Sequence, residues 1–261
     1  MLRPGLVSIS FRSLSPREIV DLCVQSALEG IEWGGDVHIP PGEIQIARKV
    51  GQMTRDAGIE VAAYGSYYRC DGETPFEKVL QSALELGAPL IRVWAGNKGS
   101  ADVTQGEKDA VVADLRAICE LASAQNIGIV TEYHGGTLTD TRDSCRELHQ
   151  KVSHSNLQTL WQPLRRGSSL NAKISENLED LRDVAPFLSN VHVYEWRDIV
   201  VGQRKAFSLQ KSPQWPQYIG ELQKIGGKRW MLLEYVPDDD PQILAREAAA
   251  LRALIAGEQI V

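Results

Sequence analysis

The chain has 261 residues, of which 43% are hydrophobic, and its formal net charge is −6, from 28 Lys and Arg against 34 Asp and Glu. This composition is typical of a globular protein with one large core. The acidic balance disfavours a nucleic-acid-binding surface, which needs a basic stripe. No segment is long and apolar enough to span a membrane, and the N-terminus lacks the apolar segment of a signal peptide. The four cysteines are scattered, which favours a reduced, cytoplasmic protein.

Strand-like apolar runs alternate with amphipathic segments along the chain. The runs are VSISF at 7–11, IEW at 31–33, EVAAY at 60–64, LIRVW at 90–94, GIVTEY at 128–133, QTLW at 158–161, VHVYE at 191–195 and MLLEY at 231–235. Helical spacing of apolar residues predicts helices at 15–30, 74–87, 107–125, 142–152, 175–188, 213–225 and 241–256. Ser15 followed by Pro16 is a typical helix start.

Eight such strand–helix units, of about 33 residues each, fit the size of the βαβ module. Strands that alternate with helices indicate a parallel sheet, and eight units predict a single (β/α)₈ TIM barrel over residues 1–261. An open, doubly wound sheet is the alternative. It is disfavoured because no GxGxxG motif follows the first strand.

Four polar side chains lie at or near the ends of the last four runs: Glu132, Gln162, His192 and Glu234. In such barrels the active site lies at the C-terminal ends of the strands. Two carboxylates, an imidazole and an amide suit a divalent metal such as Mn²⁺, Zn²⁺, Co²⁺ or Mg²⁺. Each residue alone also has an ordinary reading, as a solvated strand end or, for His192, a core histidine. His192 also comes early in its run, which argues against a place at the strand end.

Glutamate, an Asp-type ligand, histidine and glutamate on the last four strands resemble the metal site of the xylose isomerase-like TIM barrel family. The resemblance extends through EYHGG, NVHVYEW and LLEYV. It implies that Glu132, His192 and Glu234 are metal ligands. Gln162 stands where that family usually has aspartate, so the site loses one negative charge and weaker metal binding is expected.

The resemblance implies a metal-dependent sugar isomerase or epimerase that acts next to a carbonyl. Glu132 and Glu234 would remove and return a carbon-bound proton. A lyase of the inosose or dehydroshikimate dehydratase type shares this fold and metal. A non-catalytic barrel that binds a sugar or a partner is the third hypothesis, and the amide at Gln162 motivates it.

Further residues are candidates for substrate binding. Strand alternation places His134 on the same side as Glu132, and Arg197 follows the seventh strand. Aromatic rings at strand ends can stack on a sugar, although at least half of such rings are expected to cap the core instead. The remaining candidates are Trp33, His38, Arg92, Trp94 and Trp196.

Glu32 and Arg92 lie on the second and fourth strands, and alternate strands contribute to one interior layer. They are therefore expected to meet as an ion pair inside the barrel, with a structural role favoured over a substrate contact. His149 and His154 flank a helix end and are expected on the surface.

The last strand is followed by PDDDP, whose negative charge disfavours a phosphate, whereas Arg197 would favour an anion. The expected partner is therefore a small sugar or polyol without a phosphate, in carbohydrate metabolism. Members of the family are often dimers or tetramers, so a homo-oligomer is possible.

Overall fold

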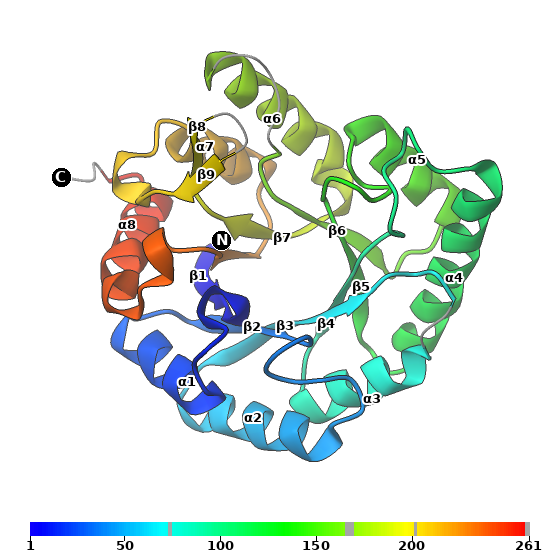
Figure 1. Ribbon diagram of the computed structural model, residues 1–261, viewed down its shortest axis with the longest axis horizontal. Coiled ribbons are helices and arrows are strands. Elements are labelled where there is room, and N and C mark those ends of the chain that lie inside the picture. The colour runs from blue at the N-terminus through cyan, green and yellow to red at the C-terminus, as the bar shows by residue number, and fades with distance from the viewer. Residues whose placement is uncertain (73–74, 165–169, 201–202, 259–261) are drawn as a thin grey trace.

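Eight parallel strands close into a barrel in the computed structural model, which describes residues 1–72, 75–164, 170–200 and 203–258 (Figure 1). The strands are β1 (Leu2–Val7), β2 (Gly30–Gly34), β3 (Glu60–Tyr68), β4 (Leu90–Val93), β5 (Gly128–Glu132), β6 (Leu157–Trp161), β7 (Leu188–Val193) and β10 (Arg229–Leu233). Each strand pairs with the next along the chain, and β10 pairs with β1 to close the ring. This topology confirms the expected TIM barrel.

A helix follows each strand, and the eight helices form the outer ring seen in Figure 1. They are α1 (Pro16–Gln25), α2 (Ile44–Asp56), α3 (Phe76–Leu86), α4 (Gln105–Ser123), α5 (Arg142–Val152), α6 (Leu170–Val184), α7 (Trp215–Ile225) and α8 (Leu244–Ala256). Ser15 caps α1 as expected, and the Glu18 side chain completes a capping box. Within the ranges described, no helix has both the length and the apolar character needed to cross a membrane.

The first strand lies earlier than the sequence suggested. The segment 7–11 was expected as a strand, but β1 ends at Val7 and residues Ser8–Phe11 form a 3-10 turn, η1. Pro4 and Gly5 weaken the strand signal of β1, because both residue types are depleted in strands. The turn is stabilised by Ser8, whose hydroxyl accepts a hydrogen bond from the Gly34 amide at 2.8 Å. The chain therefore leaves the barrel after Val7.

Two elements have no counterpart among the expected ones. Helix α2 buries one larger apolar residue, Val50, and otherwise small or polar residues, Ala47, Gly51 and Thr54, so few large apolar side chains mark its spacing. A Cβ at Gly51 would collide with the Leu86 carbonyl, so glycine allows α2 and α3 to approach closely. The second element is an antiparallel hairpin of β8 (Trp196–Val200) and β9 (Gln203–Ala206), inserted between β7 and α7.

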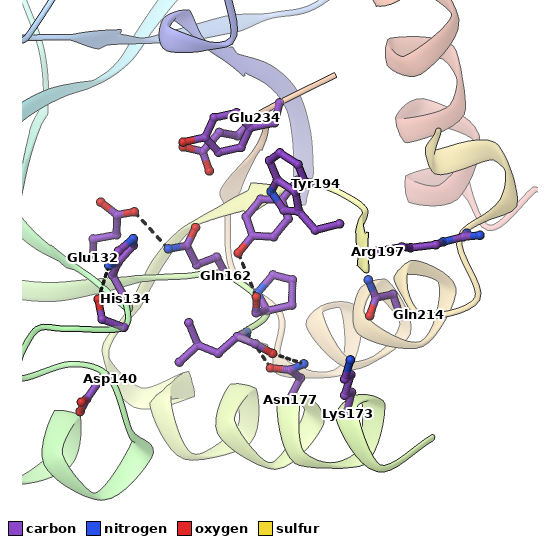
Figure 2. A pocket seen from close by; sticks show the side chains of 15 residues that line it. Glu132, His134, Asp140, Gln162, Lys173, Asn177, Tyr194, Arg197, Gln214 and Glu234 are labelled. Carbon is purple, nitrogen blue, oxygen red and sulfur yellow. Dashed lines mark hydrogen bonds between the residues drawn. The ribbon is translucent and has the colours of Figure 1, made fainter. Parts of the chain in front are cut away.

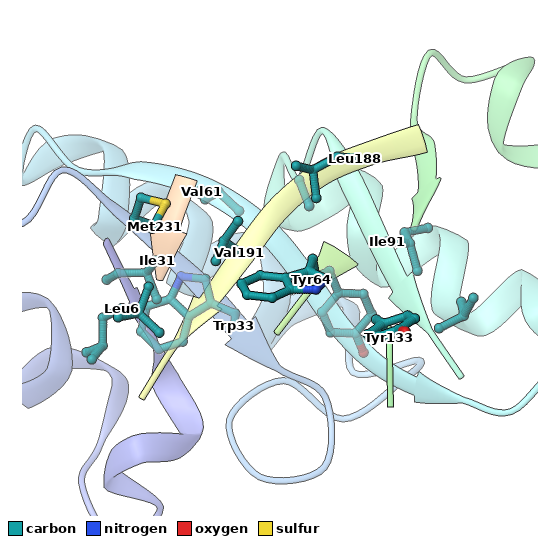
Figure 3. Close-up of a cluster of buried hydrophobic side chains, with 14 of the residues drawn as sticks. Leu6, Ile31, Trp33, Val61, Tyr64, Ile91, Tyr133, Leu188, Val191 and Met231 are labelled. Carbon is teal, nitrogen blue, oxygen red and sulfur yellow. The ribbon is translucent and has the colours of Figure 1, made fainter. Parts of the chain in front are cut away.

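The apolar side chains form two cores of unequal size. The large core lies between the strands and the helices, and Figure 3 shows part of it around Ile31, Ile91 and Val191. The small core includes Val7, Ala62 and Leu232 from three barrel strands. Successive side chains of a strand point to opposite faces, so Glu32, Arg92 and His192, next in sequence to the large-core residues, face the barrel interior. These inward-facing polar side chains belong to the candidate site.

Candidate active site

A cavity of about 520 Å³ opens at the C-terminal ends of β5, β6, β7 and β10 (Figure 2). Its volume lies within the usual range for small-molecule sites. Glu132 ends β5, and Gln162 and Glu234 directly follow β6 and β10, as the predicted placement at strand ends requires. The cavity is lined by Glu132, His134, Gly135, Asp140, Gln162, Pro163, Leu164, Lys173, Asn177, Tyr194, Trp196, Arg197, Gln214, Glu234 and Tyr235.

Glu132 is a buried carboxylate held by three donors. Arg92 Nη1 and Trp94 Nε1 donate to Oε2, the latter at 2.6 Å, and Gln162 Nε2 donates to Oε1 at 3.0 Å. Burial alone would raise the pKa of the Glu132 carboxyl, but the positive charges of Arg92 and His192 lower it more, so its pKa lies below the ordinary value. Glu132 is therefore ionised and fixed in position.

The predicted ion pair between Glu32 and Arg92 is present inside the barrel. Arg92 Nε lies 2.7 Å from Glu32 Oε1, and both side chains are buried. Burial raises the pKa of Glu32, but His192 and Arg92 outweigh it and bring that pKa to about 2. Arg92 does not line the cavity, contrary to its expected role in substrate binding, because its guanidinium lies between Glu32 and Glu132.

His192 lies behind Glu234 and does not reach the cavity. Its Nε2 is 3.2 Å from Glu32 Oε2, and its Nδ1 is 3.3 Å from Glu234 Oε2. Burial lowers the pKa of His192, but Glu234 and Glu32 raise it more, to about 10. The Nδ1 contact is close but poorly aligned, and Nδ1 has no hydrogen-bond partner among the residues described.

The four expected metal ligands do not converge as the side chains stand. In the described parts of the chain, no three His, Cys, Asp or Glu side chains are gathered into a metal site. The reason lies in the ion pairs above and in Gln162, which turns its amide nitrogen toward Glu132 Oε1 and the Tyr133 carbonyl. The four residues therefore stay a proposed ligand set.

The same donors nevertheless suit a divalent cation chemically. A histidine that binds a metal must be neutral. With His192 in that form, the net charge of Glu32, Glu132, Glu234 and Arg92 is −2, which a divalent cation would balance. The buried Nδ1 of His192 needs a partner beside Glu234. Carboxylate oxygen and imidazole nitrogen are ordinary ligands for such ions.

Three other predicted residues lie at the cavity. His134 and Trp196 line it, as does Arg197. The His134 ring stacks on Trp94, with ring centroids 4.7 Å apart, and its Nδ1 is 2.6 Å from the Gly135 carbonyl. Trp94 does not line the cavity and instead donates to Glu132. The structure therefore brings His134, Trp196 and Arg197 together with the two glutamates.

Three predicted positions differ from their expected places. Trp33 and His38, expected at the substrate, pack edge to face away from the cavity and are buried. Trp33 has the opposite strand parity to the inward-facing Glu32, so its ring points toward the helices. His149, expected on the surface, is also buried, because its Nε2 lies 2.6 Å from the Thr159 hydroxyl.

Three polar residues on one flank of the cavity were not predicted from the sequence. Lys173 and Asn177 come from α6, and Gln214 directly precedes α7. Figure 2 shows Lys173, Gln214 and Arg197 on one flank, away from Glu132. Positions just after the C-terminal ends of strands could have pointed to this flank, but these residues lie in helices and loops whose bounds were uncertain.

A further buried carboxylate, Glu195, holds this flank together. It accepts hydrogen bonds from Ser212 at 2.6 Å and Gln214 at 3.0 Å, and Arg197 Nε lies 3.1 Å from it. Its strand parity, opposite to that of His192, had excluded it as a metal ligand. In the structure Glu195 does not line the cavity.

Comparisons with known proteins place the fold and the family. The model of the family described as xylose isomerase-like TIM barrel matches residues 20–254. A curated 3-dehydroshikimate dehydratase of Bacillus anthracis is 32% identical over 168 residues, which is 60% of this chain and 60% of the relative. The chain thus spans less than two thirds of that relative's length.

Solved structures with under 25% identity share the fold. A probable 3-DHS dehydratase of Bacillus anthracis has a TM-score of 0.78 at 23% identity and covers 97% of this chain and 99% of its own. A D-psicose 3-epimerase of Clostridium cellulolyticum has 0.70 at 14%, covering 97% and 99%. A Mycobacterium smegmatis barrel protein in complex with magnesium has 0.72 at 14%, covering 98% and 97%. Together with the family match over residues 20–254, the fold and the strand-end glutamates lead to one conclusion: the chain belongs to the xylose isomerase-like TIM barrel family.

Proposed function

We propose that the protein is a dehydratase of a small hydroxy-oxo acid of the 3-dehydroshikimate type. One observation carries this proposal: the cavity has three carboxylates, with Glu132 and Glu234 at strand ends and Asp140 before α5, and a separate flank with two cationic side chains, Lys173 and Arg197 (Figure 2). A substrate with a carboxylate at one end and a ketone beside a removable proton at the other matches both parts.

The cationic side chains of this flank favour an acidic substrate over a neutral sugar. Arg197 already donates through Nε to Glu195 and through Nη2 to the Lys211 carbonyl, so its guanidinium is held in place at the cavity. A fixed guanidinium recognises a carboxylate by charge and by directed hydrogen bonds. Because Lys173 and Arg197 line the cavity, a substrate with a carboxylate is favoured over the neutral sugar or polyol that the sequence led us to expect.

The relatives support the same direction. The curated protein at 32% identity and the solved structure at TM-score 0.78 are both named as dehydratases of this compound. The epimerases among the solved structures share less sequence, at 14–17% identity. The dehydratase is therefore placed ahead of the isomerase or epimerase that the sequence motifs favoured.

Glu234 acts as the base in this proposal. Glu132 is bound by Arg92, Trp94 and Gln162, which weakens it as a proton acceptor. Glu234 has its neighbour His192 on one oxygen only. Glu234 takes the proton from the carbon next to the ketone, and the electron pair of that C–H bond forms the new C=C bond.

The hydroxyl on the next carbon then leaves with its bonding electrons and takes up a proton, so that one water is released. His134 lines the cavity and, with both ring nitrogens protonated, donates this proton from Nε2 while its Nδ1–H stays on the Gly135 carbonyl. Glu234 then releases its proton to water and His134 takes one up, so both groups return to their starting states. Glu132, His192, Glu234 and the amide oxygen of Gln162 would hold a divalent metal, which supplies Lewis-acid polarisation of the ketone when bound. Glu132 is ionised and fixed in position, so its negative charge would help to balance the charge of the metal.

Ultraviolet absorbance tests the proposal, since loss of water from 3-dehydroshikimate gives a conjugated aromatic acid. Metal-supplemented protein should produce this absorbance, and Glu234→Gln should lower the rate by about 10²–10⁴-fold. Absence of product with every metal tested would contradict the proposed dehydratase activity.

The paired glutamates keep the isomerase or epimerase as the second candidate. Proton exchange on a ketose without new absorbance would favour it. A folded protein that binds Mn²⁺ and sugars but turns over neither would instead indicate the non-catalytic barrel.

A further inference from the structure

Glu32 on β2 lies beneath the cavity, and the proposed reaction does not use it directly. The side chain is fully buried and does not line the cavity. Both carboxylate oxygens have a charged or titratable partner: Oε1 accepts from Arg92 Nε at 2.7 Å, and Oε2 lies 3.2 Å from His192 Nε2.

Each of these two partners leads to one of the cavity carboxylates. Arg92 Nη1 donates to Glu132 Oε2, and His192 Nδ1 lies 3.3 Å from Glu234 Oε2. An unbroken chain of buried side chains therefore runs from Glu132 through Arg92, Glu32 and His192 to Glu234. Glu32 is its central member, and it is the only one of the five that touches both halves.

The backbone leaves room for this chain at β3, which lies between β2 and β4. A Cβ on Gly65 would lie 2.6 Å from Arg92 Nη2 and 2.9 Å from Glu32 Oε1. Gly65 pairs in register with Arg92 on the neighbouring strand. Any larger residue would push the guanidinium away from Glu32, so the glycine is part of the arrangement.

A purely structural ion pair is the simpler alternative. Burying an ion pair gains little stability, because desolvation cancels most of the attraction. A structural role also does not explain why the pair lies directly beneath the cavity or why it continues to both carboxylates. An orienting role explains both features, since a carboxylate on the far nitrogen of a histidine fixes which nitrogen carries the proton.

We infer that Glu32 is a positioning residue for both cavity carboxylates: through Nε2 it orients the His192 ring so that Nδ1 lies beside Glu234, and through Arg92 it fixes Glu132. This inference rests on the proposed function for its catalytic consequence, but its effect on metal binding stands without it.

Glu32→Gln tests the inference because it keeps the shape of the side chain. Arg92 Nε–H needs an acceptor, so the new amide oxygen faces Arg92 and the amide NH₂ faces His192 Nε2. That nitrogen must then accept, so the neutral ring that metal binding requires carries its proton on Nδ1, the atom beside Glu234. A protonated Nδ1 cannot ligate, so Mn²⁺ affinity, measured from the electron paramagnetic resonance signal of free Mn²⁺, should fall by about 10–100-fold.

Glu32→Asp and Thr159→Val serve as controls. Glu32→Asp keeps the charge, so Nε2 keeps its proton and Mn²⁺ affinity should fall less than in Glu32→Gln. Thr159→Val alters a buried hydroxyl outside the site and should leave Mn²⁺ affinity unchanged. If dehydratase activity is present, Glu32→Gln should lower kcat by at least about tenfold with little change in KM, as expected for a change that acts on the reacting state.

Folded Glu32→Gln with wild-type Mn²⁺ affinity would overturn the inference. If that variant does not fold, Gly65→Ala provides the second test, since it displaces Arg92 without changing any charge, and unchanged Mn²⁺ affinity and unchanged kcat in it would likewise overturn the inference. Loss of Mn²⁺ affinity in a protein that never dehydrates the substrate would instead support the inference and refute the proposed function.

Discussion

Two of the regions in which this barrel buries polar side chains differ in charge. At the barrel mouth, Glu32, Arg92, Glu132, His192 and Glu234 form a charged cluster, which we call the interior cluster. Between the strands and α5, Thr131, Thr159, Cys145 and His149 form a neutral cluster, which we call the outer cluster.

The histidines show the difference most clearly. Two carboxylates raise the pKa of His192 to about 10, whereas burial without a charged partner lowers the pKa of His149 to about 4. The same side chain is thus held as a cation in one region and as a neutral ring in the other. The side chains of the outer cluster hydrogen-bond to one another between strand and helix and need no charge to do so. The interior cluster is charged, although neutral side chains could also satisfy the buried hydrogen-bonding groups there.

The largest expected difference is in stability. Arg92→Met would leave Glu32 and Glu132 as buried carboxylates without their shared cation, which typically costs about 3–5 kcal/mol. Urea unfolding of the metal-free protein measures this loss. A loss below about 1 kcal/mol would mean that the interior cluster relaxes or takes up protons easily, and the contrast between the two regions would disappear.

A smaller loss is expected from the outer cluster. Thr159→Val removes a hydroxyl that contacts Thr131 at 2.9 Å and His149 at 2.6 Å, and leaves both without that partner. The cost should be about 1–3 kcal/mol in the same unfolding experiment. Turnover per folded molecule should not change, and a fall in kcat would show that the outer cluster also serves the reaction.

Metal binding should respond to changes in the interior cluster and in Gln162 beside it, and not to changes in the outer cluster. Gln162→Asp adds a carboxylate where the amide nitrogen of Gln162 now donates to Glu132. The variant should be less stable without metal, because two carboxylates then face each other, and should bind Mn²⁺ at least about tenfold more tightly, a gain of about 1.4 kcal/mol. Calorimetric titration measures the affinity, and equal or weaker binding would remove Gln162 from the ligand set.

The pH dependence of stability should have opposite signs in the two regions. His149 has a pKa below its ordinary 6.5, so its contribution to the unfolding free energy is present above that pH and is lost as the pH falls toward 4. His192 has a pKa above 6.5, so its contribution is present below that pH and is lost as the pH rises toward 10.

Two variants separate these contributions in metal-free protein. The stability difference between wild type and His149→Gln should shrink from pH 7 to 4, and the difference between wild type and His192→Gln should shrink from pH 7 to 10. Parallel behaviour of the two variants would show that the carboxylates do not hold His192 in its charged form.

The regular features of the fold were accessible from the sequence because they repeat. Strand–helix alternation predicted the barrel, and strand parity with the alternation of layers predicted the Glu32–Arg92 pair across 60 residues. The first strand was misplaced because Pro4 and Gly5 weaken its signal while Ser8–Phe11 has the composition of a strand. Local pattern cannot show that Ser8 binds the Gly34 amide.

The site was only partly predictable for a related reason. Strand ends identified Glu132, Gln162 and Glu234, since the end of a strand has a fixed place in a barrel. Lys173 and Gln214 depend on how a helix and a loop fold back over the mouth, which no short pattern records. The hydrogen bonds that occupy Glu132 depend on side-chain rotamers, so strand ends alone could not show that Gln162 donates to Glu132.

Proton exchange tests the central claim most directly, namely that Glu234 at the interior cluster removes a carbon-bound proton from a substrate in the cavity. The measurement is the proton NMR spectrum of substrate and product after incubation with metal-supplemented protein in D₂O. Wild type and Thr159→Val should remove or exchange the proton next to the ketone, and Glu234→Gln should not. Loss of that proton at the wild-type rate in Glu234→Gln would contradict the account.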